Sequence, residues 1–424
     1  MSSLRKENIV RATLLITLAA VTITLPLVVQ AQTFSVIHTF SGNGDGYQPY
    51  AGLTIDGGGH LYGTTTEYIG GTVYEMKRVN GIWTFNTLLN FNGRDGLIPY
   101  SKVVFGTSGA LFGTTFEGGT SLDCEFGCGA VYDLLPSGAV CKTFSCPWTA
   151  NAIVSFTDGA DGGNPNLVDP VFDRQGNLYG TTAIGGSTGI GVVFQLTHTG
   201  GGWTENVLHN FTGPDGAYPY SGLIFDQAGN LYGTTGYGGQ FNQGTVYKLS
   251  PSGSGWTLTT LYSFQGGADG TEPAAALIMD QAGNLYGSTV VGGAGGGGTV
   301  FKLSPSGGDW TFSLIYSLVG HQNQNFYPGV FNPLAMDAQG NLYGTAVLDG
   351  AHSNGSVFKL SPSGGTWTYT SLHDFTNGAD GANPFAGVTF DANGNLFGTT
   401  VYGGTTNGQA CQGIGCGVVW EITP

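Results

Sequence analysis

Short apolar runs with alternating polar residues recur along the chain, and turns rich in glycine separate them. One unit shows this clearly, with β-prone runs at 221–226, 230–235, 245–249 and 256–264. Alternation with a period of two residues is typical of a half-buried strand. No segment has the spacing of an amphipathic helix, and Gly or Pro interrupts most stretches that could form one. The pattern therefore predicts four antiparallel strands in each unit.

The unit is repeated along the chain and is marked by the heptapeptide GNLYGTT. Seven versions of it occur, spaced about 50 to 67 residues apart, and a fixed period in this range is typical of a solenoid, a propeller or a tandem array. They start at Gly59, Gly109, Gly176, Gly229, Gly283, Gly340 and Gly394. Four strands in each of seven units predict an all-β fold, a seven-bladed β-propeller.

The two ends of the repeat array indicate how the ring closes. The seventh unit ends in its third strand, at 417–422, and has no fourth strand. An isolated β-prone run, Phe34–Phe40, precedes the first unit. We expect this N-terminal strand to complete the last blade, which would remove an unpaired sheet edge.

The first 31 residues differ from the repeats. Arg5, Lys6 and Arg11 form a basic start, an apolar run covers 12–29, and Val29-Gln30-Ala31 has the small residues of a cleavage site. This pattern predicts a secretory signal peptide at 1–31 and a propeller domain at 32–424. The alternative is an uncleaved membrane anchor, because the apolar run is nearly long enough to span a bilayer. We expect a secreted or periplasmic monomer that has no membrane segment after cleavage.

Composition narrows the class of partner. The chain has 12 Lys and Arg against 27 Asp and Glu, a net charge of −15. Nucleic acid is therefore not expected as a partner, since phosphate binding needs a basic surface. The chain has 76 glycines without a G-x-y period, which excludes collagen. The excess of carboxylates favours solubility and could serve cations.

A family resemblance follows from the motifs. The units contain GNLYGTT, a following GG, GTVYKLSPSG and an FxxGxDGxxP junction. This text resembles the tandem GloVer (Gloeo/Verruco) repeat of secreted bacterial proteins of the "choice-of-anchor" type, over nearly all of residues 32–424. The resemblance implies secretion and a repeat architecture, and it implies no particular activity.

The junctions between units hold the candidate binding residues. An Asp-Gly precedes a Pro by four residues at Asp45, Asp95, Asp161, Asp215, Asp269 and Asp380. Aromatic residues follow that Pro at Tyr50, Tyr100, Tyr220 and Phe385. In a propeller these junctions gather on one face, where carboxylates and aromatic rings could bind a sugar. The alternative interpretation is that Asp-Gly is turn chemistry and the rings only pack at the rim.

Metal and cofactor chemistry has weak support. Calcium could bind to the carboxylates, but no D-x-D-x-D-G loop is present, so we expect no required cofactor and treat Ca²⁺ as optional. His38, His209 and His373 occupy one common slot near the end of a strand, which favours packing over metal binding. No HExxH, GxSxG or P-loop motif occurs.

Six cysteines in a chain with a secretion signal predict three disulfides. Cys124 and Cys128 lie in the loop before the third strand of the second unit, and Cys141 and Cys146 lie in the loop after it. That strand separates the two loops by about 20 Å, whereas a disulfide needs Cα atoms within about 7 Å. The predicted pairs are therefore Cys124–Cys128, Cys141–Cys146 and Cys411–Cys416.

The sequence alone favours a binding or interaction module for an extracellular polysaccharide. The first alternative is an extracellular polysaccharide lyase or glycoside hydrolase, but every unit offers Asp, so no catalytic pair stands out. The second alternative is a structural protein of the cell envelope. No catalytic residue is assigned.

Overall fold

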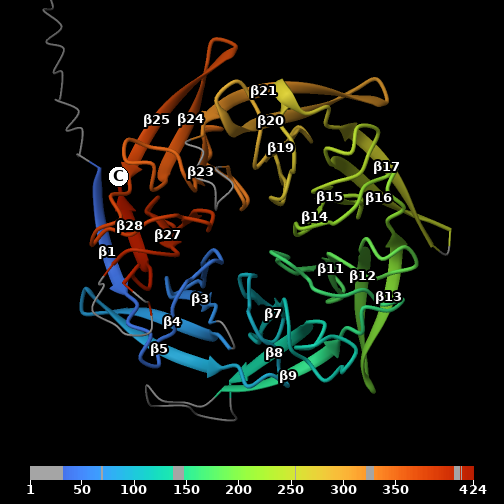
Figure 1. Cartoon of the computed structure of the whole chain (residues 1–424), viewed down its shortest axis with the longest axis horizontal. Helices are drawn as coiled ribbons and strands as arrows, with labels where there is room; N and C mark the ends of the chain where they lie inside the picture. Colours follow the sequence, from blue (N-terminus) through green and yellow to red (C-terminus); the bar gives the residue numbers. More distant parts are fainter. Residues whose placement is uncertain are drawn as a thin grey trace, which may run out of the picture. The chain divides into compact units, whose positions relative to one another are not determined.

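The computed structural model describes residues 32–67, 70–136, 148–253, 255–320, 329–404, 411 and 413–424. The unit Gln32–Pro424 is compact and consists of seven four-stranded antiparallel sheets. Figure 1 shows these sheets as blades around a central axis. The predicted seven-bladed β-propeller is therefore confirmed.

The first four blades are continuous in sequence. Blade 1 contains β2 (Thr54–Ile55), β3 (Leu61–Thr65), β4 (Thr72–Val79) and β5 (Ile82–Asn90), and blade 2 contains β6 (Val104–Phe105), β7 (Leu111–Thr115), β8 (Ala130–Pro136) and β9 (Trp148–Ser155). Blade 3 contains β10 (Val171–Phe172), β11 (Leu178–Thr182), β12 (Val192–Thr199) and β13 (Gly202–Asn210), and blade 4 contains β14 (Ile224–Phe225), β15 (Leu231–Thr235), β16 (Thr245–Ser252) and β17 (Gly255–Ser263). In each blade the strands, here called a to d, run from the axis outward.

The last three blades follow the same order. Blade 5 contains β18 (Ile278–Met279), β19 (Leu285–Ser288), β20 (Gly296–Ser306) and β21 (Asp309–Val319), and blade 6 contains β22 (Ala335–Met336), β23 (Leu342–Ala346), β24 (Ser356–Ser363) and β25 (Thr366–Asp374). Blade 7 contains β26 (Thr389–Phe390), β27 (Leu396–Thr400), β28 (Val418–Thr423) and, as its outer strand, β1 (Thr33–Thr39). Gly267–Asp269 forms the 3-10 turn η1, and no helix of the described residues is long and apolar enough to cross a membrane.

The N-terminal strand closes the ring as predicted. β1 pairs antiparallel with β28, with Phe34 opposite Ile422 and Val36 opposite Trp420. Strands from the two ends of the chain therefore share one sheet, visible in Figure 1 where the blue β1 lies beside the red β28. This pairing covers the edge of β28, which would otherwise present unpaired N–H and C=O groups.

The heptapeptide has a packing role in strand b. Gly233 lies opposite Tyr247 of strand c, and a Cβ on Gly233 would approach the Tyr247 hydroxyl oxygen to 2.5 Å. Tyr247 is fully buried between blades 3 and 4, against Phe211 and Leu231. The glycine therefore makes room for the large ring that fills the space between two sheets.

The turn between strands a and b is held by its Asp. Asp226 Oδ1 accepts hydrogen bonds from the backbone N–H groups of Ala228 and Asn230, both at 2.9 Å. Its Oδ2 accepts one from Tyr232 Oη at 3.1 Å. These bonds fix the hairpin and also hold the Tyr232 ring where the next blade packs against it.

Neighbouring blades also meet through rings on their outer strands. Tyr262 of blade 4 stacks on Phe312 of blade 5 with ring centroids 4.6 Å apart, and Tyr316 of blade 5 stacks on Tyr369 of blade 6 at 4.8 Å. In blades 1, 5 and 6 an aromatic residue stands two positions after the Trp of strand d, at Phe85, Phe312 and Tyr369. Blades 2, 3 and 4 have Ala150, Glu205 and Leu258 at that position.

Candidate functional site

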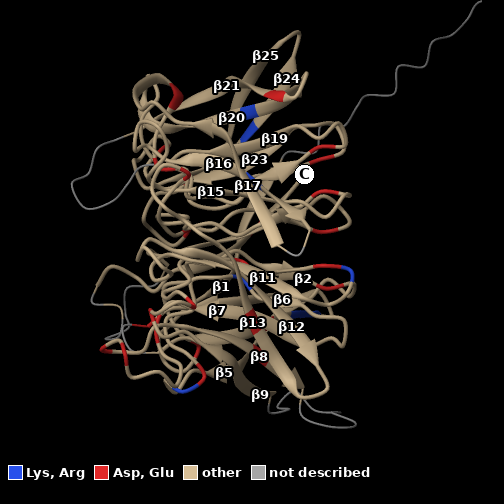
Figure 2. Ribbon diagram, turned by 90° about the vertical axis from the view of Figure 1, so that its right-hand side faces the viewer, with Lys and Arg blue, Asp and Glu red and all other residues tan. Residues whose placement is uncertain are grey.

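The d-to-a and b-to-c loops lie on one side of the ring, which we call the junction face. Among the described residues, five d-to-a loops form a β-bridge with the b-to-c loop of the blade that follows, for example between Leu97 and Glu117. Figure 2 shows acidic residues in the loops at both ends of the strands and few basic ones. The predicted binding residues all belong to this face.

A pocket of about 520 Å³ opens on the junction face where blades 7, 1 and 2 meet. Pockets of this size that mix apolar surface with a few polar groups are typical of small-ligand sites. It is lined by Tyr47, Gln48, Tyr50, Thr66, Glu67, Leu97, Ile98, Tyr100, Phe116, Glu117, Phe126, Cys411, Ile414 and Gly415. No Lys or Arg occurs among these lining residues.

Three of the four predicted aromatic residues come together at or beside this pocket. Tyr50 contacts Tyr100 edge to face, with ring centroids 5.3 Å apart, and contacts Phe385 at 5.0 Å. Phe385 is buried in an apolar cluster that also includes Tyr402. Burial raises the pKa of Tyr50 and of Tyr100, so both phenols are neutral and can donate hydrogen bonds. Tyr220 belongs to a different aromatic group, with Tyr218 and Tyr237.

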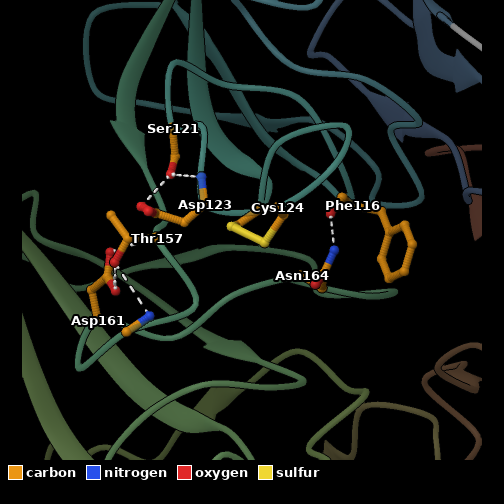
Figure 3. The surroundings of a disulfide bond; sticks show 9 residues. Phe116, Ser121, Asp123, Cys124, Thr157, Asp161 and Asn164 are labelled. Atoms are coloured by element: carbon orange, nitrogen blue, oxygen red, sulfur yellow. Dashed lines mark hydrogen bonds between the residues drawn. A yellow bond between two sulfur atoms is a disulfide. The ribbon is translucent and has the colours of Figure 1, made fainter.

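The junction Asp side chains accept hydrogen bonds from their own loops. Asp161, for example, accepts bonds from Thr157 N at 2.9 Å and Thr157 Oγ1 at 2.6 Å, and Figure 3 shows both. The same kind of backbone bond reaches Asp45 from Ser41, Asp95 from Asn92, Asp215 from Thr212, Asp269 from Gln265 and Asp380 from Thr376. These carboxylates therefore shape the loops that carry the aromatic rings, whatever further contacts they make.

The common-slot histidines also contact these aspartates. His209 Nε2 lies 2.8 Å from Asp215 Oδ2, and His373 Nε2 lies 3.1 Å from Asp380 Oδ2. Burial acts to raise the pKa of Asp215, but hydrogen bonds from His209 and Thr212 outweigh it and lower that pKa below its ordinary value. The sequence suggested packing for these histidines, and the structure adds a polar contact to that packing.

The residue before each junction Pro has a left-handed backbone. It is Ile98 before the second unit, with φ of 55°, and positive φ recurs at Gln48, Asn164, Tyr218, Glu272 and Asn383. A β-branched residue is strained in this region. Hydrogen bonds maintain it: Ile98 N donates to Gly70 O of blade 1 at 2.8 Å, and Ile98 O accepts from Phe116 N of blade 2 at 3.0 Å. We call this bridge between neighbouring b-to-c loops the junction clasp.

Two lining carboxylates were missed by the sequence analysis. Glu67 and Glu117 occupy the second position after GTT in blades 1 and 2, and the other blades have Ile184, Tyr237, Val291, Leu348 and Tyr402 there. Burial, together with the charge of Asp45, raises the pKa of Glu67, and burial with the charge of Glu125 raises that of Glu117. Among the described residues neither side chain takes part in a hydrogen bond or ion pair. Variation at one position of an otherwise regular repeat is the signal that could have revealed them.

Two of the predicted disulfides border the pocket. Cys124–Cys128 and Cys411–Cys416 have Cα atoms 5.3 and 5.2 Å apart and close the b-to-c loops of blades 2 and 7. Each loop presents one exposed apolar side chain to the pocket, Phe126 at 53% exposure and Ile414 at 52%. Cys141 and Cys146 lie outside the described residues, so their pairing stays a prediction.

A second cavity, of about 350 Å³, follows the axis and is lined by residues from all seven blades. Its charged groups are paired, since Lys102 Nζ lies 3.5 Å from Asp169 Oδ2. Across the described part of the chain, no three His, Cys, Asp or Glu side chains gather into a group that could hold a metal ion. The pocket on the junction face is therefore the stronger candidate site.

Seven antiparallel four-stranded blades with a pocket on the junction face define this protein as a seven-bladed β-propeller. The model of the Gloeobacter/Verrucomicrobia repeat matches residues 67–280, 126–331 and 171–412. These matches cover more than half of the chain, so the protein belongs to the Gloeobacter/Verrucomicrobia repeat family. A comparison with curated proteins gives no match.

Several solved structures match the chain at low identity. A candidate 6-phosphogluconolactonase from Bacteroides uniformis is 14% identical, with a TM-score of 0.48, over 77% of this chain and 84% of that one. A luciferin-regenerating enzyme is 13% identical, with a TM-score of 0.45, over 93% and 95%. A protein of unknown function from Dyadobacter fermentans is 10% identical, with a TM-score of 0.47, over 93% and 99%.

Proposed function

We propose that the protein is a secreted propeller that binds an extracellular polysaccharide at the junction-face pocket. The observation that carries the proposal is the placement of the two disulfide loops. Of the described b-to-c loops only those of blades 2 and 7 are closed by disulfides, and both border this one pocket. Cross-links in short loops hold a surface in one conformation, which reduces the entropy lost on binding.

The chemistry of the pocket suits a sugar chain. Tyr50, Tyr100 and Phe126 offer aromatic surface for the apolar faces of sugar rings, and neutral phenols with two carboxylates can bond to hydroxyl groups. Disulfides also accord with an oxidising compartment outside the cytoplasm. The junction Asp residues support the site by fixing its loops, and any calcium would act as a bridge to the ligand.

The rest of the junction face could extend the contact. On the far side of the ring in Figure 1, blades 4 and 5 carry a second group that combines Tyr218, Tyr220 and Tyr237 with Glu272. Two weak aromatic sites on one rigid ring would together bind a long polymer more tightly than either alone. This supports a polymer as the ligand.

Binding is tested by affinity electrophoresis against a panel of soluble polysaccharides, with thermal melting of each variant as a check on folding. Tyr100→Ala and Phe126→Ala should each weaken retardation by the bound polymer. Leu122→Ala is the matched control, because Leu122 is 95% exposed in the same loop and does not line the pocket. Unchanged binding in both pocket variants would place the binding surface elsewhere, and release of reducing sugar would favour the enzyme alternative.

A further inference from the structure

The junction-face pocket has an unusual charge for a site built of aromatic rings. Its lining includes the carboxylates of Glu67 and Glu117 and no Lys or Arg. Asp45 lies close enough to Glu67, and Glu125 to Glu117, to add to the negative potential there. A neutral glycan would leave these two half-buried carboxylates without a counter-charge, which is costly for groups removed from water.

The two carboxylates are also held on rigid backbone. Leu97 and Glu117 exchange backbone hydrogen bonds, with Leu97 N donating to Glu117 O at 2.8 Å and Glu117 N donating to Leu97 O at 3.1 Å. Thr66, next to Glu67, donates from its N–H to Gln48 O at 3.1 Å. Backbone pairing therefore holds the chain at Glu117 and beside Glu67 against the pocket.

Aromatic rings beside these carboxylates favour one class of ligand. The negative face of an aromatic ring attracts a cation, and cages of aromatic and acidic residues are used to recognise substituted ammonium groups. Tyr100 lies near Glu117, which acts on its phenol, and Tyr50 contacts Tyr100. An ammonium group that enters the pocket would meet a carboxylate and an aromatic face together.

We propose that the pocket recognises the protonated amine of an amino-sugar polymer, so that the ligand is a glycan with free ammonium groups. Glu67 and Glu117 provide the counter-charges, and Tyr50 and Tyr100 contact the sugar ring that carries the amine. The inference rests on the proposed polysaccharide binding and names its substrate class. The net charge of −15 would also attract a polycationic chain over a longer range.

Isothermal titration calorimetry on the full mature chain tests this with three oligosaccharides of matched length: β-1,4-linked glucosamine, its N-acetylated form and a neutral glucose oligomer. The glucosamine oligomer should bind at least about tenfold more tightly than the other two, and its affinity should fall as salt is added. Glu67→Gln with Glu117→Gln should weaken binding of the glucosamine oligomer far more than binding of the N-acetylated form, and so remove this preference. Asp309→Asn, an exposed change at the start of β21 that removes one negative charge, is the control for a change of charge away from the pocket.

Other outcomes separate the two proposals. Equal affinity for the amine and N-acetylated forms, unaffected by the Gln variants, would overturn the amino-sugar inference and leave polysaccharide binding in place. Binding of the N-acetylated or neutral oligomer only with added Ca²⁺, and its loss with a chelator, would also overturn it in favour of a calcium bridge. No binding of any oligosaccharide or polymer would overturn both.

Discussion

The ring of Phe34 stacks on the imidazole of His373, with ring centroids 3.6 Å apart and an interplanar angle of 5°. Phe34 belongs to β1, whereas His373 belongs to β25 of blade 6, so the N-terminal strand contacts a second blade as well as completing its own. Burial lowers the pKa of His373, although the nearby Asp380 carboxylate acts in the opposite direction. Closure of the ring is therefore a matter of side-chain packing as well as of strand pairing.

Removal of this strand should open the ring. Deletion of residues 32–41 should lower the melting temperature sharply and promote association through the exposed edge of β28. Phe34→Ala should reduce the free energy of unfolding by about 2 kcal/mol, since it removes a large ring from the contact between two blades. Thermal and chemical denaturation measure both effects. A truncated protein that melts at the wild-type temperature would show that β1 is not needed for closure.

Glu205 should make the protein less stable as the pH rises. Burial, together with the charge of Asp161, raises the pKa of Glu205 from 4.5 to about 8 in the folded state. Between these values the folded protein holds a proton that the unfolded chain has released, so the free energy of unfolding falls as the pH rises and levels off above about 8. Glu205→Gln should remove this part of the slope and stabilise the protein most at the alkaline end. Parallel curves for wild type and Glu205→Gln in denaturation across this range would refute the assignment, and Asp309→Asn serves as the control.

The pocket disulfides should matter for binding as well as for stability. Replacing Cys411 and Cys416 by Ser should cost about 2 kcal/mol of stability from the chain-entropy relation for so short a loop. It should also weaken polymer binding, because Ile414 would no longer be held at the rim. The matched experiment replaces Cys141 and Cys146, which should leave binding unchanged. A non-reducing peptide map should show Cys141 paired with Cys146, and any pair between the two blade-2 loops would contradict the prediction.

Ile98 should be a site of stored strain. A β-branched residue with φ of 55° costs about 1–2 kcal/mol relative to a residue that tolerates this region. Asn occupies the same junction position at Asn164 and Asn383, so Ile98→Asn should raise the free energy of unfolding by about 1 kcal/mol. Asn164→Gly, at an already tolerant position, should bring no such gain. Destabilisation by Ile98→Asn would mean that apolar contacts of Ile98 in the pocket outweigh its backbone strain.

The fold could be predicted because its strand and turn motifs recur in each unit of the sequence. A version of GNLYGTT marks strand b in every blade. The seventh unit lacks its outer strand, and the additional β-prone run at 34–40 could supply it. The structure places β1 against β28 as that pattern requires. Repetition also explains why the local pairs Cys124–Cys128 and Cys411–Cys416 could be predicted, since each lies within a single loop.

The candidate site was harder to predict, because it depends on what is not repeated. The aromatic residues common to several junctions include Tyr50, Tyr100 and Phe385, which the structure brings together, and Tyr220, which lies in another aromatic group. Glu67 and Glu117 are not part of this common pattern, because only blades 1 and 2 have Glu at that position. Their proximity in one pocket depends on how blades 7, 1 and 2 meet. The sequence of a single unit does not determine that geometry.

At the junction clasp the backbone conformation is constant, whereas the residue type differs between blades. The clasp itself uses backbone atoms of residues such as Gln48, Ile98 and Tyr218, and at Asn164 and Asn383 the side-chain amide adds a hydrogen bond to the preceding b-to-c loop. The six described clasps carry five different residue types while their backbone angles stay nearly constant. The backbone conformation at each junction is therefore constant while the side chain varies. Substitution of these side chains could give the propeller a different junction face without a change in its core.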